Sequence, residues 1–556
     1  MGPVADHDLE CPSMAGELPV KVECLPFSRI PHSTRLFLDF LSYSPQLQKF
    51  YPRSPSLAEW RTQETPGEGY DAARRRQVSD ALERQNRAWN ASPKTLDNIA
   101  RLRSGASAVV TGQQVGLFGG PLFSILKALT AVKLAEEASA AGGDVVPIFW
   151  LATTDHDLAE VNHTLLPGPE ASLHAIATAS RGLDEAPVGT VTFGPEIEAA
   201  VQSVSELLGA TQATDFLREY YRPGETLGSA FARLFSRLFG DFGVILIDPS
   251  DPDFHAFAEP MYRAAIERAA ELDDALLTRG KALEDAGYHQ QVKVTPLSTL
   301  LFTLKNGARI PIHRRTATAE FLVRDEKLSR EELLRQIAAT PQDFSPNVLL
   351  RPVVQDYLLP TLAYTGGAAE VAYFAQAGVV YEKLLGRVTP IVPRFSATLV
   401  EQKPKALLDR YGLALPDAFH GEELLREKIA ARVLPAELQQ AFDRANTTVQ
   451  ESLSTVREAL AKLDKTLVDA ADNASSKMQH QVESLRARAA RAELRQSEVV
   501  TRHAQQLSNS LFPNKALQER EIAAIYYLSR YGIEFLSTLY NTLQTGCHDH
   551  QVVRLD

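Results

Sequence analysis

The stretch Thr111-Gly-Gln-Gln-Val-Gly-Leu-Phe-Gly-Gly-Pro-Leu-Phe-Ser-Ile-Leu-Lys127 decides the fold that we expect for this chain of 556 residues. It follows an apolar run at 106–110 and leads into a helical pattern that continues to about Ala140. A strand, a glycine-rich turn and a helix start in this order form a site for an anionic or adenine-bearing ligand. Glycine allows the backbone to approach the ligand closely, and the helix start offers unpaired N–H groups. Pro121 suits the first helical position.

The turn fits neither of the common phosphate-binding loops. It lacks the G-x-G-x-x-G spacing, and it lacks the Lys-Ser/Thr ending of a P-loop. A tight turn without a ligand is the alternative, but two adjacent glutamines beside four glycines favour a ligand site. We predict that Gln113 takes part in catalysis. The predicted ligand-binding residues of this stretch are Thr111, Gly112, Gln114, Gly116, Leu117, Phe118, Gly119 and Gly120.

Other apolar runs predict the remainder of a parallel sheet. Val145–Leu151 is a continuous apolar run of the kind that is buried on both faces of such a sheet, and 243–247 is another. The pattern loosens at 165–240, which indicates an insertion between the two halves of the core. Asn306-Gly307 predicts a β-hairpin, because this pair accepts the positive φ angles of a type I′ turn. The expected fold class is α/β with a parallel-sheet core.

The C-terminal part has a different, coiled-coil pattern. Apolar residues step by alternating threes and fours through Leu453, Val456, Leu460, Leu463, Leu467, Ala470 and Ala474. Proline is absent from 436–512. An antiparallel hairpin and a dimer zipper both remain open, and a structural role is favoured for this arm.

Composition excludes several classes of function. The net charge of −11 argues against a nucleic-acid-binding surface as the main role. Cys11, Cys24 and Cys547 are far apart and predict neither a disulfide framework nor a zinc site, which fits a reducing cytoplasm. The N-terminus lacks an apolar segment typical of a signal peptide, and no apolar run is long enough to span a membrane. We expect a soluble cytoplasmic protein.

Polar residues directly after the strand at 145–151 are candidates for catalysis, because ligands bind beyond the carboxyl ends of parallel strands. Asp155, His156 and Asp157 place two carboxylates and an imidazole in three residues, a group suited to general acid–base chemistry. Capping of the following helix by an aspartate is the alternative. A divalent metal held together with His163 is a further one. We predict no metal site and assign His163 to substrate binding.

A second glycine turn opens a helix at Tyr364-Thr-Gly-Gly-Ala-Ala-Glu370. Glu370 falls in the first helical turn, where its charge favours the helix dipole and can receive a substrate ammonium. A capped helix start without a ligand is the alternative. Arg394 follows a further apolar run and is a candidate for phosphate binding. The predicted binding residues of this region are Tyr364, Gly366, Gly367, Glu370 and Arg394.

Four segments carry a family resemblance from about Thr34 onwards. They are TGQQVGLFGGPLFSILKA, VPIFWLATTDHDLAEVNH, SPNVLLRPVVQDYLLPTLAYTGGAAEVAYFAQ and LFPNKALQERE, in this order. Together they resemble the BshC family, the cysteine ligases of bacillithiol biosynthesis. The resemblance implies a Rossmann-like core related to class I aminoacyl-tRNA synthetases, with connecting-peptide insertions. It also implies a C-terminal α-helical coiled-coil domain and a homodimer.

Combined with the patterns above, the resemblance divides the chain into five parts. These are a flexible tail at 1–20, the first half of the core with N-terminal helices at 21–164, a connecting-peptide insertion at 165–240, the second half of the core with an inserted hairpin and helix at 241–400, and a helical coiled-coil domain at 401–556.

The leading functional hypothesis is a ligase that joins cysteine to the amine of glucosaminyl-malate, with ATP as the activating cosubstrate. The His-x-Gly-His and Lys-Met-Ser-Lys-Ser motifs of class I synthetases are absent. Cysteines that could hold a zinc ion for thiol selection are not clustered in the sequence. A non-catalytic nucleotide-binding assembly protein is the alternative, and a nucleotidyltransferase with another acceptor is a third hypothesis.

Overall fold

The computed structural model describes residues 20–64, 70–178, 186–315, 320–432, 436–494 and 498–555. The tail predicted at 1–20 lies outside these ranges except for its last residue, and so does Cys11.

The centre of the fold is a five-stranded sheet in the order β13-β12-β2-β3-β6, in which all neighbouring strands run parallel. The strands are β2 (Ser107–Gln113), β3 (Val145–Leu151), β6 (Ile245–Ile247), β12 (Thr361–Gly366) and β13 (Ile391–Pro393). All residues of β3 are buried, as its continuous apolar run predicts. The α/β fold class with a Rossmann-like parallel core is confirmed.

Alternate side chains of β3 enter two different hydrophobic cores, because successive residues of a strand point to opposite faces. Ile148 and Trp150 pack into a core that includes side chains of helix α3 (Ala72–Ala88). Phe149 and Leu151 pack into a core that includes side chains of α5 (Leu122–Ala140) and α9 (Leu227–Leu238). The helices on the two faces therefore fix the sheet between them. In the described portion of the chain, none of the helices combines the length and the apolar character needed to cross a bilayer.

Two groups of helices and strands lie between β3 and β12 in the sequence. The segment after β3 forms the hairpin of β4 (His163–Pro167) and β5 (Leu173–Ala177), followed by α7 (Glu196–Leu208), α8 (Gln212–Tyr220) and α9 (Leu227–Leu238). A second sheet contains the hairpin of β7 (Ser298–Lys305) and β8 (Ala308–Arg315). Its turn residues Asn306 and Gly307 have φ angles of 52° and 79°, so the predicted hairpin is confirmed.

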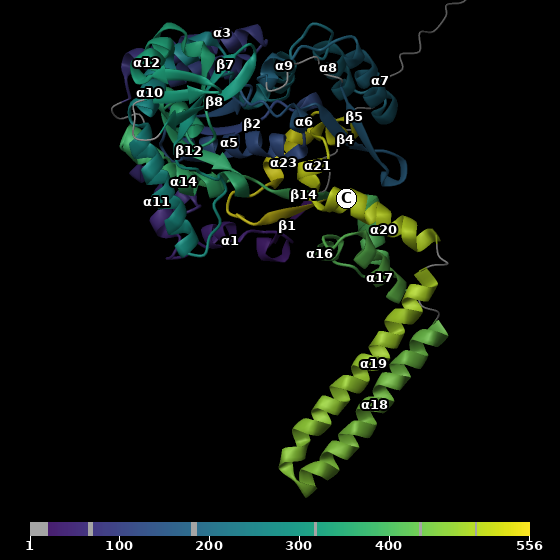
Figure 1. Cartoon of the computed structure of the whole chain (residues 1–556). Helices are drawn as coiled ribbons and strands as arrows, with labels where there is room; N and C mark the ends of the chain where they lie inside the picture. The colour runs from purple at the N-terminus through teal and green to yellow at the C-terminus, as the bar shows by residue number, and fades with distance from the viewer. Residues whose placement is uncertain are drawn as a thin grey trace, which may run out of the picture.

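A helical hairpin projects far from the globular body (Figure 1). It consists of α18 (Ala436–Leu463) and α19 (Val468–Leu494), which run antiparallel side by side. This is the antiparallel hairpin that the sequence left open beside a dimer zipper, and the apolar seam from Leu453 to Ala474 is interrupted at 464–467, where the chain reverses. Asp464 accepts a hydrogen bond from the Thr466 N–H at 2.9 Å and so caps the short turn Lys465–Leu467 between the two helices. The chain then returns through α20 (Glu498–Leu511) to the globular body.

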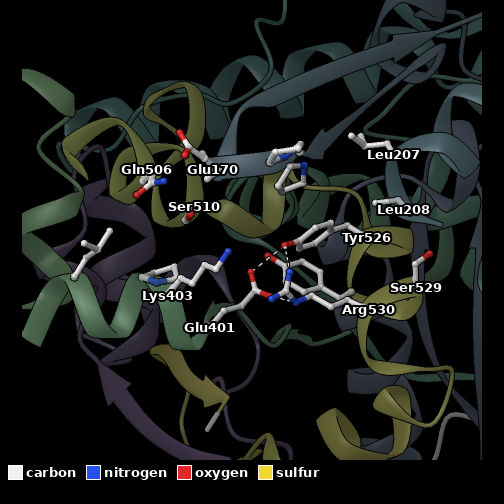
Figure 2. Close-up of a pocket in the computed structure, with 17 residues that line it drawn as sticks. Glu170, Leu207, Leu208, Glu401, Lys403, Gln506, Ser510, Tyr526, Ser529 and Arg530 are labelled. Carbon is white, nitrogen blue, oxygen red and sulfur yellow. Dashed lines mark hydrogen bonds and ion pairs between the residues drawn. The ribbon is translucent and has the colours of Figure 1, made fainter. Parts of the chain in front are cut away.

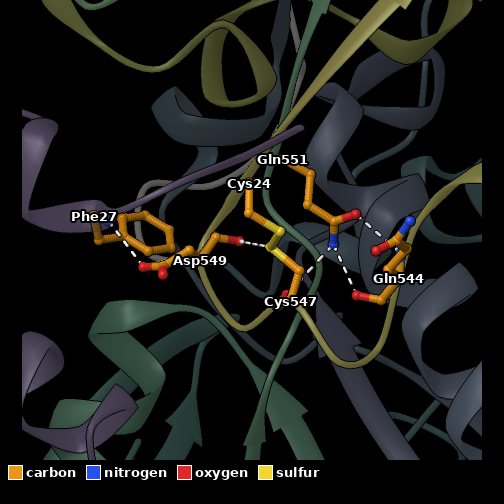
Figure 3. Close-up of a disulfide and its surroundings, with 6 residues drawn as sticks. All are labelled: Cys24, Phe27, Gln544, Cys547, Asp549 and Gln551. Carbon is orange, nitrogen blue, oxygen red and sulfur yellow. Dashed lines mark hydrogen bonds between the residues drawn. A yellow bond between two sulfur atoms is a disulfide. The ribbon is translucent and has the colours of Figure 1, made fainter. Parts of the chain in front are cut away.

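The two ends of the described chain meet in a three-stranded sheet of order β1-β15-β14. β1 (Val20–Leu25) pairs antiparallel with β15 (His550–Leu555), and β14 (Ala397–Val400) lies on the other side of β15. Cys24 and Cys547 form a disulfide beside this pairing, with Cα atoms 6.3 Å apart (Figure 3). The prediction that the cysteines form no disulfide is therefore wrong. Strand pairing brings together two residues that are 523 positions apart in the sequence.

Candidate active site

A cavity of about 290 Å³ opens at the carboxyl ends of β2, β3 and β12. Its walls come from the ends of these strands, from α5 (Leu122–Ala140) and from α14 (Ala368–Leu385). This is the edge of a parallel sheet at which ligands bind in open α/β folds. The residues singled out in the sequence that line it are Gly112, Gln113, Gln114, Asp155, Tyr364, Gly367, Glu370 and Arg394.

A buried ion pair lies at the base of this cleft. The Lys127 ammonium is 2.7 Å from the Glu370 carboxylate, and it also donates to the Gly112 carbonyl at 2.7 Å and to Gln113 Oε1 at 2.9 Å. Only 3% of Lys127 is exposed. Burial lowers the pKa of Lys127 to about 8, and the Glu370 charge opposes this shift. Lys127 therefore holds the end of β2 and orients the Gln113 side chain.

Glu370 is the centre of a wider hydrogen-bond network. Burial alone raises the pKa of Glu370, but Lys127, the Tyr364 hydroxyl and the Gly367 N–H together lower it below its usual value. Tyr364 donates to Glu370 Oε1 at 2.6 Å, and the Gly367 N–H donates to Oε2 at 2.8 Å. Burial, followed by the Glu370 charge, raises the pKa of Tyr364 far above its ordinary value. Tyr364 is therefore a permanent donor, and Glu370 caps α14 while it faces the cleft.

Arg351 adds a second fixed cation to the same wall. It lies at the start of α13 (Arg351–Leu358), donates to the Tyr373 hydroxyl at 2.8 Å and donates to Gln355 at 3.2 Å. Its guanidinium carbon is 5.7 Å from the centre of the Tyr364 ring. Hydrogen bonds and ring packing thus hold the guanidinium in place, so the cleft has a preorganised positive wall.

The three residues predicted for acid–base catalysis after β3 differ in their relation to the cleft, although His156 Nδ1 lies 3.4 Å from the Asp155 carboxylate. Asp155 lines the cleft and accepts a hydrogen bond from the Gln114 side chain at 2.7 Å. His156 is exposed, and its Nδ1 accepts a hydrogen bond from the Arg309 guanidinium at 3.2 Å. Asp157 is exposed and caps α6 (Leu158–Val161) by accepting from the Glu160 N–H. His156 and Asp157 do not line the cleft, because the chain turns outwards after Asp155. Their catalytic role stays a prediction.

The glycine turn after β2 is packed rather than open. β2 continues to Gln113, and Pro121 is the residue before α5 instead of its first residue. The Gly119 N–H donates to the Tyr221 hydroxyl at 3.2 Å, and the Gly120 N–H donates to the Leu117 carbonyl. The fold itself therefore uses most of the turn's N–H groups, and its role as a ligand cradle stays a prediction. The predicted residues that are buried away from the cleft are Thr111, Leu117, Phe118, Gly119, Gly120 and Gly366.

Gly116 and His163 lie in an adjoining cavity of about 390 Å³, on the other side of Gln113 and Gln114. A Cβ atom at Gly116 would lie 2.8 Å from the Gly120 Cα. This close approach explains why the turn requires glycine at 116, independently of any ligand.

The C-terminal part of the chain forms the remaining wall of the cleft. Helix α21 (Gln518–Glu521) packs against α5 and β14. Glu519 is fully buried and accepts from Arg394 at 2.7 Å, and Arg520 lines the cleft beside Phe123. Burial raises the pKa of Glu519, but the Arg394 charge overcomes this effect and lowers it. The guanidinium predicted to bind phosphate is thus already paired with a carboxylate on one edge.

The cleft residues that the sequence patterns did not assign include Phe123, Lys127, Glu160, Tyr373 and Arg520. Lys127 has a recognisable signal, because it is a lone charge in the apolar helical run from Leu122 to Leu129. Arg520 has no comparable local signal. It reaches the site only because the chain returns from the helical hairpin to the core.

A separate cavity of about 330 Å³ lies between β4, α15 (Gln402–Arg410) and α22 (Ala524–Tyr531) (Figure 2). Its main carboxylate, Glu401, accepts from Arg530 at 2.8 Å, from Tyr531 at 2.7 Å and from Tyr526 at 3.1 Å. These groups satisfy one another, and Lys403 is the charged group that projects beside them. The cleft at the strand ends is therefore the better candidate for the reaction.

Comparisons with known proteins agree on one family. Residues 20–395 match the model "Bacillithiol biosynthesis BshC, N-terminal Rossmann-like domain", and residues 397–555 match "Bacillithiol biosynthesis BshC, C-terminal coiled-coil domain". A relative from Koribacter versatilis named "Putative cysteine ligase BshC" is 50% identical over 96% of this chain and 99% of its own length. Relatives of the same name from Solibacter usitatus and Salinibacter ruber are 36% and 35% identical, over 95% and 93% of this chain and 99% and 96% of their own lengths.

Proposed function

The chain belongs to the BshC family of bacillithiol biosynthesis, and from this premise we propose that the cleft joins cysteine to the amine of glucosaminyl-malate. The observation that supports this most is the buried Lys127–Glu370 pair at the carboxyl ends of the parallel strands. It provides fixed charges of both signs in one cavity, which suits substrates that carry both ammonium and carboxylate groups.

The proposed reaction begins with activation of the cysteine carboxylate by ATP as an acyl-adenylate, with release of pyrophosphate. The glucosamine nitrogen then attacks the acyl carbon, the C–N bond forms, and the C–O bond to AMP breaks. The attacking amine must lose a proton. Asp155 is the residue proposed to accept it, since its carboxylate lines the cleft and is oriented by Gln114. Lys127 fixes the Gln113 side chain by a hydrogen bond, and Gln113 in turn orients the acyl group.

The test is incubation of the purified chain with cysteine, glucosaminyl-malate and ATP, followed by mass spectrometry of thiols and nucleotides. We expect bacillithiol and AMP in equal amounts. Lys127→Met and Asp155→Asn should each lower the rate by at least about 100-fold, in the range of lost acid–base and electrostatic contributions. Lys403→Met removes a lysine from the separate cavity and is the matched control, which should keep the wild-type rate.

Absence of both amide product and nucleotide turnover in the wild type would contradict the proposal. Pyrophosphate release without an amide product would instead favour a nucleotidyltransferase. Full thiol production by Lys127→Met and Asp155→Asn would favour the assembly-protein alternative.

We also propose a homodimer that forms through the helical hairpin. Val456, Met478 and Leu485 on the hairpin are 48%, 50% and 59% exposed, so the hairpin offers apolar side chains that a second copy of the chain can cover. Light scattering of the wild type and of a Val456→Glu/Leu485→Glu variant tests this. A dimer that dissociates in the variant supports the proposal, and a wild-type monomer at all concentrations contradicts it.

A further inference from the structure

The Arg520 side chain stands where three cavities adjoin. It lines the cleft above the Lys127–Glu370 pair and the neighbouring cavity that contains His163. It also lines a third cavity of about 300 Å³, whose walls include Phe27 and Phe512. A group at this junction can contact a ligand in any of the three spaces.

Arg520 differs from the other cations around it. The Phe123 ring is flanked by the charged groups of Lys127, Arg394 and Arg520, at 5.9, 5.3 and 5.7 Å from its centre. Lys127 is paired with Glu370, and Arg394 is paired with a buried glutamate. Among the residues that the structure describes, the Arg520 guanidinium has neither a hydrogen bond nor an ion pair. Its five donors are therefore available to a ligand.

The backbone that carries Arg520 is held firmly on both sides. Gln518 is buried and accepts from the Leu399 N–H at 2.7 Å, while its amide donates to the Leu399 carbonyl at 2.9 Å. Glu519 is buried and accepts from the Ala397 N–H at 2.7 Å. Ile522, on the other side, is fully buried. The exposed arginine thus projects from a fixed backbone, which sets its position relative to the cleft.

The chain segment just before Arg520 contains backbone conformations that are uncommon for non-glycine residues. Asn514 and Lys515 are consecutive non-glycine residues with φ angles of 52° and 62°. Such conformations cluster at functional sites, because the surrounding structure must hold them in place. The Asn514 side chain donates to Glu521 at 2.7 Å and so closes the loop around Arg520.

We infer that Arg520 is an oxyanion-binding residue that holds a carboxylate or phosphate of a substrate at the junction of the three cavities. The planar guanidinium binds two oxygens of such a group at once. This inference rests on the proposed function, in which two substrates offer the required chemistry. Glucosaminyl-malate carries the two carboxylates of its malyl group, and ATP carries a triphosphate.

Steady-state kinetics of Arg520→Gln, with each substrate varied in turn, test the inference. We expect the KM for one anionic substrate to rise about 10- to 100-fold, as for a lost hydrogen-bonded ion pair, with a much smaller change in kcat. Arg520→Lys keeps the charge without the bidentate geometry, so its KM should lie between those of wild type and Arg520→Gln. Arg502→Gln, an exposed arginine on α20 outside the cleft, is the matched control.

Methyl glucosaminide, an amine substrate without carboxylates, distinguishes the two sources of the anion. If Arg520 holds the malyl group, wild type and Arg520→Gln use methyl glucosaminide equally well. If Arg520 holds a phosphate, the deficit persists with this substrate and appears in the KM for ATP. Unchanged KM values for glucosaminyl-malate and ATP in Arg520→Gln would overturn the inference.

Calorimetric binding of glucosaminyl-malate and of ATP separates this inference from the proposed reaction. If wild type forms no amide but binds either ligand, and Arg520→Gln binds that ligand at least 10-fold more weakly, the oxyanion site stands while the reaction fails. Equal affinities of wild type and variant for both ligands would refute the site.

Discussion

Replacing Glu370 by glutamine removes the charge that faces the buried Lys127 ammonium at 2.7 Å. An unpaired buried charge can cost about 3–5 kcal/mol, but Lys127 can avoid this cost by losing its proton. Its pKa is about 8 in the folded wild type, against 10.5 in an ordinary lysine. At 1.36 kcal/mol per pKa unit, deprotonation limits the cost to about 1 kcal/mol at pH 7 and about 3 kcal/mol at pH 6.

The sign of the pH dependence follows from the depressed pKa of Lys127. Between pH 8 and 10.5 the folded wild type binds fewer protons at Lys127 than the unfolded chain does, so this group makes stability rise with pH in that window. In Glu370→Gln the pKa of Lys127 falls further, and the window extends downwards. The difference in stability between wild type and variant should therefore shrink as the pH rises from 6 to 8 and stay constant above 8.

Urea unfolding of both proteins at pH 6, 7, 8 and 9 measures this difference. Hydrogen bonds lost from Tyr364 and Gly367 add an offset that does not vary with pH in this range. The control is the same substitution in a Lys127→Met background, where the pH dependence should vanish. If the stability difference between wild type and Glu370→Gln, both with Lys127 intact, is constant from pH 6 to pH 9, the reasoning is refuted.

Two further predictions concern the contacts of the C-terminal segment. Glu519→Gln leaves the Arg394 guanidinium, which is 6% exposed, without its carboxylate and should lower the free energy of unfolding by about 3–5 kcal/mol, measured by urea unfolding; a loss below about 1 kcal/mol would contradict the role of this pair. Cys24 and Cys547 should be inaccessible to a thiol reagent in the denatured, unreduced chain, which then titrates one thiol out of three cysteines; three reactive thiols would show that the disulfide is not formed.

Several features could be predicted from local sequence alone. The apolar run of β3 is continuous because both faces of a parallel strand are buried. Asn306-Gly307 marks the hairpin of β7 and β8, because few other residue pairs adopt two positive φ angles. The ends of β2, β3 and β12 meet at one edge by the geometry of parallel strands. That rule placed Gln113 and Asp155 at this edge, and the glycine turn that opens its helix singled out Glu370.

Local sequence patterns could not predict features that depend on tertiary packing. The apolar steps from Leu453 to Ala474 could not decide between a hairpin and a dimer zipper, because their spacing continues unchanged through 464–467, where the chain reverses. Glycines at 116–120 suggested an open cradle, yet their N–H groups are used by Tyr221 and by the turn itself.

The sequence by itself determined the fold class, the helical arm and the family of this protein, since each depends on periodicities and motifs within short segments. The tertiary structure decided which side chains share the cleft. Arg520 lies 393 positions after Lys127 and yet flanks the same Phe123 ring, and Cys24 is bonded to Cys547. The physical reason is that packing of α21 against α5, and pairing of β1 with β15, bring these residues together whatever their distance along the chain.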